Sequence, residues 1–131
     1  MNKELIQKLI EHARMASDNA FCPTTGVPEG CSLLVEGNVI FGGCNIESSN
    51  PLCSITAGAV AISKAISEGL TKMMAICFYS DTVMPYPNGA LLDLIAEFNY
   101  GIDIIVASQK DYSIHKLHEL LPIRRIHSEE A

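Results

Sequence analysis

The sequence predicts one α/β domain over residues 1–131, in which helices pack against a mixed β-sheet. Hydrophobic residues make up 48% of the 131 residues, which is enough for one compact core. A hairpin signal joins two apolar strand-like runs, and helix-like and strand-like segments alternate after it. Strand–helix–strand order favours parallel neighbouring strands, so the predicted sheet is mixed. No internal repeat or linker divides the chain.

The first third of the chain predicts a helix, a loop and a hairpin. Residues 3–19 carry apolar side chains at helical spacing, and residues 21–29 are rich in proline, threonine and glycine. Residues 31–36 and 39–44 read as two strands. Gly37-Asn38 between them is a two-residue turn signal, so these strands are expected to pair.

The rest of the chain predicts alternating helices and strands. Asn50 followed by Pro51 predicts a helix start, because asparagine is a good N-cap and proline suits the first helical position. Gly69 is expected to end this helix. The later predicted elements are a strand over 73–79, a helix over 90–98, a strand over 102–107 and a short helix over 115–121.

Charge and cysteine content limit the classes of partner. The formal net charge is −6 with no basic stripe, which argues against nucleic acids and anionic membranes but suits a small neutral ligand. No apolar run is long enough for a membrane-spanning helix, and the charged N-terminus does not resemble a signal peptide. The five cysteines form no C-x-x-C pair. We therefore expect free thiols and a reducing cytoplasm.

Several segments, in order along the chain, carry a family resemblance. The stretch 39–47 ends in Gly-Cys-Asn-Ile-Glu, and the segment 64–69 reads Lys-Ala-Ile-Ser-Glu-Gly. Pro87-x-Gly89-Ala90 and the tail over 120–122 follow at matching distances. The chain resembles the small cytidine deaminases along nearly its whole length. The resemblance implies a three-layer α/β/α sandwich with a mixed sheet and a homo-oligomer, either a dimer or a tetramer.

The residues that this family uses for catalysis are replaced here. Zinc deaminases hold the metal with a cysteine or histidine and a later Pro-Cys-x-x-Cys, and a glutamate two residues after the first ligand transfers protons. By the resemblance, the ligand positions are Thr56, Asn88 and Leu91, and the glutamate position is Gly58. We therefore expect no metal ligands, no zinc cofactor and no catalytic residues.

The resemblance assigns Asn45 and Glu47 to contacts with ribose hydroxyls. A carboxylate and an amide suit the edge of a sugar, but these residues also suit a structural role in the turn before Asn50. Thr56 and Asn88 have two readings as well. They are expected to cap helix starts, and the pocket between them is expected to suit phosphate or another small polar ligand.

Two further groups of residues contain side chains that can bind metal. Cys53 precedes Thr56 by about one helical turn, which would place both on one helix. His115 and His118 are spaced i,i+3 on the short helix predicted for 115–121, a spacing that chelates metal on some helices, but exposed polar residues are the simpler interpretation.

Several functions remain open at this point. The favoured one is a catalytically deficient cytidine deaminase-like protein that binds a nucleoside or related small molecule without zinc. The alternatives are an active cytidine deaminase that hydrolyses cytidine to uridine, an enzyme of altered chemistry, and an interaction subunit with no small ligand, for which an active paralogue is one candidate partner. Zinc content and a uridine assay separate the active deaminase from the rest.

Overall fold

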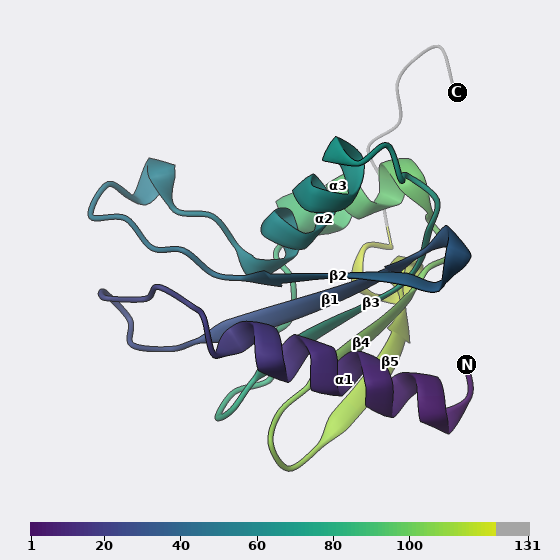
Figure 1. Ribbon diagram of the computed structural model, residues 1–131, viewed down its shortest axis with the longest axis horizontal. Helices are drawn as coiled ribbons and strands as arrows, with labels where there is room; N and C mark the ends of the chain where they lie inside the picture. The colour runs from purple at the N-terminus through teal and green to yellow at the C-terminus, as the bar shows by residue number, and fades with distance from the viewer. Residues whose placement is uncertain (123–131) are drawn as a thin grey trace.

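The computed structural model describes residues 1–122, and residues 123–131 of the predicted domain lie outside the described residues. A five-stranded sheet forms its centre, with helices on both faces (Figure 1). The elements in chain order are α1 (Lys3–Ser17), β1 (Glu29–Val35), η1 (Glu36–Asn38), β2 (Val39–Cys44), η2 (Pro51–Cys53), α2 (Ala57–Ser67), β3 (Met73–Ser80), α3 (Gly89–Phe98), β4 (Asp103–Ala107), β5 (Tyr112–Lys116) and α4 (Leu117–Leu120).

The sheet has the order β2-β1-β3-β4-β5 and is mixed, as predicted. β1 pairs antiparallel with both β2 and β3, while β3 and β4 are parallel and are joined through α3. The predicted hairpin is confirmed. Gly37 and Asn38 at its turn have φ angles of 78° and 60°, a left-handed conformation that glycine and asparagine tolerate best.

Two apolar cores lie on opposite faces of the sheet. α1 buries Ile6, Leu9 and Ala13 against one face. The second core includes Ile62 of α2 and Ile95 of α3, and it fills the other face. The predicted α/β/α sandwich is therefore confirmed, and α2 and α3 start at the same end of the sheet (Figure 1).

The predicted helix start at Asn50 and Pro51 is wrong. Asn50 does cap a turn, because its Oδ1 accepts from Leu52 N at 3.1 Å, but this turn is the short 3-10 helix η2. The chain then extends, and Ile55 exchanges backbone hydrogen bonds with Ile46 at 2.8 and 2.9 Å. Thr56 begins α2 as a separate helix, which ends before Gly69 as predicted. Asn50 is an N-cap and Pro51 occupies the first helical position, as predicted, but the bridge between Ile55 and Ile46 stops the helix from continuing.

The predicted helix over 115–121 is also partly wrong. Residues 112–116 form the edge strand β5, which pairs antiparallel with β4, and only Leu117–Leu120 are helical. The strand alternates between exposed and half-buried residues, but Ser113 and His115 are the less exposed ones. Because polar residues occupy the inner positions, the strand lacked the usual apolar alternation.

The described residues contain no helix that is long and apolar enough to cross a membrane. The five cysteines are all free thiols, and Cys31 and Cys77 are buried within the sheet.

Candidate functional site

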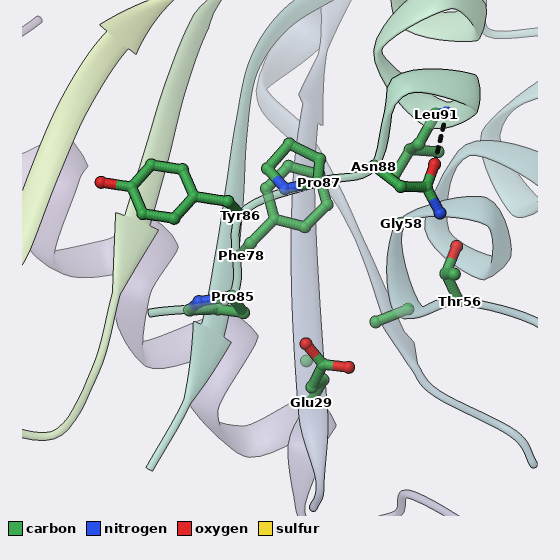
Figure 2. A pocket seen from close by; sticks show the side chains of 11 residues that line it. Glu29, Thr56, Gly58, Phe78, Pro85, Tyr86, Pro87, Asn88 and Leu91 are labelled. Carbon is green, nitrogen blue, oxygen red and sulfur yellow. Dashed lines mark hydrogen bonds between the residues drawn. The ribbon is translucent and has the colours of Figure 1, made fainter. Parts of the chain in front are cut away.

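A pocket of about 150 Å³ lies where the starts of α2 and α3 approach the end of the sheet (Figure 2). We call it the helix-start pocket. The structure brings together all four positions at which the resemblance placed metal ligands and the proton-transferring glutamate, since each of them lines this pocket. The complete lining consists of Glu29, Gly30, Thr56, Ala57, Gly58, Phe78, Pro85, Tyr86, Pro87, Asn88 and Leu91.

Thr56 and Asn88 act as helix caps in the pocket. Thr56 Oγ1 accepts from Ala59 N at 3.3 Å, and Asn88 Oδ1 accepts from Leu91 N at 2.8 Å. Each oxygen satisfies a backbone N–H that has no partner within the first turn of its helix. The amide nitrogen of Asn88 points toward the start of α2 (Figure 2).

Gly58, Leu91 and Phe78 form the apolar wall of the pocket. A Cβ built on Gly58 would lie 2.5 Å from Leu91 Cδ2 and 2.8 Å from Phe78 Cε1. Gly58 and Leu91 are buried, so the two helix starts are in direct van der Waals contact. The space that a side chain at position 58 would need is filled by carbon.

Glu29 is a pocket residue that the sequence reasoning missed. Its carboxylate points into the helix-start pocket, and the residue is half-buried (Figure 2). Burial raises the pKa of Glu29, and the nearby negative charge of Glu47 raises it further. Glu29 opens a strand whose following six residues are all buried, and an acidic residue in that position was the signal available in the sequence.

Asn45 supports Glu29 from outside the lining. Its side chain is 6% exposed, its Oδ1 accepts from Glu29 N at 2.8 Å, and its Nδ2 donates to Val27 O at 3.1 Å. Both hydrogen-bonding ends of the amide are thus used to fix the backbone before β1. Asn45 therefore holds the strand end that presents Glu29 to the pocket.

Glu47 holds the loop before β1 and does not line the helix-start pocket either. Its Oε1 accepts from the backbone N–H groups of Thr24 and Thr25 at 3.1 Å, and its Oε2 accepts from Thr25 Oγ1 at 2.8 Å. The hydrogen bonds from Thr25 and Thr24 lower the pKa of Glu47. Asn45 and Glu47 thus act together on the loop over 21–29.

The other candidate metal ligands are not brought together. Cys53 lies on the exposed η2 turn and not on the helix that begins after Thr56, so the predicted shared helix is wrong. His115 lies on β5, with its ring 5.5 Å from that of Tyr86, whereas His118 lies on α4. Residues 1–122 contain no group of three or more histidine, cysteine, aspartate or glutamate residues suited to a metal ion.

The known proteins with similar sequences are named cytidine deaminases. It is 37% identical over 97 residues to a cytidine deaminase of Sporosarcina psychrophila, a match that covers 73% of this chain and 71% of the relative. It is 34% identical over 126 residues to a Dictyostelium discoideum protein named "Probable cytidine deaminase", covering 93% and 84% of the two chains. The chain belongs to the cytidine deaminase family. No family model matches it.

Solved structures of cytidine deaminases share the fold. The Burkholderia pseudomallei cytidine deaminase superposes with a TM-score of 0.87 at 24% identity, over 95% of this chain and 100% of that one. The Mycobacterium tuberculosis cytidine deaminase gives a TM-score of 0.79 at 20% identity, over 90% and 94%. This chain therefore has the cytidine deaminase fold around the helix-start pocket.

Proposed function

We propose that this member of the cytidine deaminase family binds a nucleoside or a related small molecule in the helix-start pocket without zinc and does not deaminate it. One observation carries the proposal. The four positions assigned by resemblance to zinc and its proton-transferring partner line one pocket, and they are occupied by Thr56, Gly58, Asn88 and Leu91.

The donor set at these positions does not suit zinc. Protein zinc sites are built from thiolate, imidazole and carboxylate ligands. The oxygens of Thr56 and Asn88 each accept a hydrogen bond from their own helix, and Leu91 offers only carbon. The carboxylate of Glu29 is a single candidate ligand and has no histidine, cysteine or acidic cluster around it in the described part of the chain.

Hydrolysis is unfavourable in such a pocket. Bound zinc lowers the pKa of its water to about 7 and so supplies hydroxide near neutral pH. Glu29 is a carboxylate, and even with its raised pKa it is a weak base for removing a proton from ordinary water. Gly58 leaves no group at the position assigned to proton transfer.

Binding remains favourable on the same geometry. A pocket of about 150 Å³ is the size of an engineered cavity that admits benzene, so one six-membered ring fits. Phe78 and Tyr86 offer aromatic surface to such a ring, while Thr56 and Asn88 offer polar groups. Glu47 accepts three hydrogen bonds, which leaves about one lone-pair site on its Oε2 for a sugar hydroxyl, in line with the family resemblance.

Three measurements on the purified protein test the proposal. Elemental analysis should find far less than one zinc per chain, and incubation with cytidine should yield no uridine above the uncatalysed rate. A thermal-shift panel of pyrimidine and purine nucleosides, free bases, nucleotides and phosphate should raise the melting temperature for at least one member. Stoichiometric zinc with uridine formation would establish the active-deaminase alternative, and a panel without any shift would favour an interaction subunit.

We also propose a homo-oligomer, which a second surface supports. An apolar hollow of about 540 Å³ lies over the outer side of α2 and is lined by Phe41, Ile46, Ile55 and Val60 among others. Leu52 on the adjacent η2 turn is 93% exposed. Exposed apolar surface of this kind marks interfaces in soluble proteins. Light scattering after size exclusion should give a dimer or tetramer, and Ile55→Glu should lower the mass. Glu4→Gln, at an exposed residue of α1 that does not line the hollow, should not. A monomer would contradict this.

A further inference from the structure

We propose that Glu29 makes the helix-start pocket selective for a planar six-membered heterocycle that presents two adjacent N–H donors. A ring N–H next to an exocyclic amino group is such a pair, as in 2-amino-4-oxopyrimidine (isocytosine). This inference rests on the proposed small-molecule function and specifies the class of ring that the pocket takes.

The carboxylate of Glu29 is unpaired within the described part of the chain. Glu29 is half-buried and points into the pocket, yet within residues 1–122 no hydrogen-bond donor or cation pairs with its carboxylate (Figure 2). The charge that acts on this carboxylate is that of Glu47, which is also negative. Buried polar groups are normally paired, and an unpaired one at a cavity marks a functional site. The half-buried carboxylate is therefore available to accept hydrogen bonds from a ligand in the pocket.

The backbone that carries this carboxylate is fixed by hydrogen bonds. Asn45 binds the Glu29 backbone N–H at 2.8 Å, and Asn45 N donates to Glu29 O at 3.3 Å. Gly30, the next residue, pairs with Cys44 and Tyr79 in the two neighbouring strands. The backbone of Glu29 is fixed from both sides. The side chain is thus presented by a rigid strand end, which reduces the entropy lost when a ligand binds.

Glu29 offers hydrogen-bond acceptors to the pocket, and the two helix starts offer hydrogen-bond donors. An ionised carboxylate only accepts hydrogen bonds and binds a pair of parallel donors best. The facing wall donates: the N–H groups of Ala57 and Gly58 have no acceptor within the first turn of α2, and the amide nitrogen of Asn88 points toward them. A ring with two donors on one edge and a carbonyl beyond it matches both walls.

The same chemistry disfavours two other occupants. Cytosine places a ring nitrogen lone pair beside its amino group, so one of its two edge atoms would repel an ionised Glu29. A metal cation requires several oxygen, nitrogen or sulfur ligands, and residues 1–122 hold no acidic, histidine or cysteine cluster. Isocytosine presents a donor pair in either of its ring N–H tautomers.

Calorimetric titration with isocytosine and cytosine tests the inference, using wild-type protein, Glu29→Gln and the control Glu36→Gln. Glu36 follows the opposite end of the same strand, is exposed and does not line the pocket, so its variant removes one equal charge. Near neutral pH the wild type and the control should bind isocytosine about tenfold or more tighter than cytosine. Glu29→Gln should lose that preference, because an amide offers one donor and one acceptor, which suits the cytosine edge.

The comparison of the two rings on the wild-type protein does not depend on any variant folding correctly. Equal or tighter binding of cytosine would overturn the inference and leave the proposed function intact. The same holds if neither free base binds while a nucleoside, nucleotide or phosphate in the thermal-shift panel does. If nothing in that panel binds, the proposed function fails and this inference fails with it. Unchanged selectivity in a folded Glu29→Gln variant would also overturn the assignment to Glu29.

Discussion

The side chain of Leu91 occupies the space into which a side chain at Gly58 would project. A Cβ at position 58 would lie 2.5 Å from Leu91 Cδ2, closer than real Cβ contacts allow. Because Leu91 stands at a position assigned to a metal ligand and Gly58 at the position assigned to the glutamate, the two replacements fit each other sterically. A small residue at one position allows the large apolar residue at the other.

Gly58→Ala should lower the free energy of unfolding by about 1–3 kcal/mol, the usual cost of overpacking a core. Alanine is the better helix former, which alone would stabilise by about 1 kcal/mol, so a net loss reports the clash. Gly89→Ala at the first residue of α3 is the control, since a Cβ there would meet nothing within 4 Å. Urea denaturation measures both. Equal effects at positions 58 and 89 would contradict the packing described.

Leu91→Ala should partly relieve the cost of Gly58→Ala. Alone, Leu91→Ala should destabilise by about 2–5 kcal/mol because it leaves a cavity in the buried wall. In the double variant the methyl group of Ala at position 58 enters that space, so the two changes should couple by about 0.5–3 kcal/mol. A double-mutant cycle in urea checks this, and strict additivity would show that the two side chains do not compete.

Introducing thiolates at the positions assigned to metal ligands should create a metal site on this scaffold. We expect the triple variant Thr56→Cys, Asn88→Cys, Leu91→Cys to take up about one zinc per chain, because three thiolates with an open fourth position make a zinc site. The control is the double variant Thr56→Cys, Asn88→Cys, which keeps Leu91 and should bind zinc more weakly than the triple variant. Elemental analysis after dialysis gives the content. Failure of the triple variant to bind zinc would show that the positions do not share one coordination geometry.

Asn45→Ala should destabilise the ligand-free protein by about 1–3 kcal/mol. The substitution leaves the N–H of Glu29 and the carbonyl of Val27 without their side-chain partner in a part-buried position. Asn50→Ala, which removes a cap from the exposed η2 turn, should cost less. Thermal melts without ligand distinguish this structural role of Asn45 from a role in binding ribose. Unchanged stability with weakened nucleoside binding would instead favour the ribose role of Asn45.

Glu47 should stabilise the protein above its ordinary pKa and lose that effect in acid. Its folded-state pKa is lowered from 4.5 by the hydrogen bonds from Thr25 and Thr24, so the unfolded chain takes up the proton first. The stabilisation is complete above the unfolded pKa and disappears as the pH falls through the folded one. Glu47→Gln should therefore melt below the wild type near neutral pH, and the gap should close in acid. A gap independent of pH would refute the linkage.

The ionised carboxylate of Glu29 should destabilise the protein, in contrast to that of Glu47. Its folded-state pKa is raised from 4.5, so the free energy of unfolding falls as the pH rises from that value through the raised pKa. Glu29→Gln should consequently raise the melting temperature of the ligand-free protein near neutral pH and give little gain in acid. Scanning calorimetry across this range tests it. A lower melting temperature for the variant near neutral pH would mean that the carboxylate has a stabilising partner.

Sequence reasoning recovered most of the fold because strong local signals coincide with the tertiary structure. The Gly37-Asn38 turn, the end of α2 before Gly69 and the parallel pair of β3 and β4 follow from such signals. It failed at Asn50, where a good cap starts only one turn, because the pairing of Ile46 with Ile55 is a contact between residues distant in sequence. β5 was missed because its less exposed positions are polar.

The site was predictable in part for the same reason. Residue spacing located the pocket positions, including Thr56 and Asn88 at helix starts, because caps are local. Glu29 could not be placed from spacing, since its role depends on how the first residue of β1 lies near two helices from later in the chain. The hydrogen bonds of Asn45 with residues 16 and 18 positions away are also invisible in the sequence.

The N–H groups at the two helix starts are capped by side chains of their own segments, Thr56 for α2 and Asn88 for α3. A shared metal ion would tie two distant segments together, and folding would then depend on its supply. Here each cap forms within its own helix as soon as the first turn forms. The native state should consequently be insensitive to chelators, and a cell short of zinc should accumulate this protein at the same level as a cell with ample zinc.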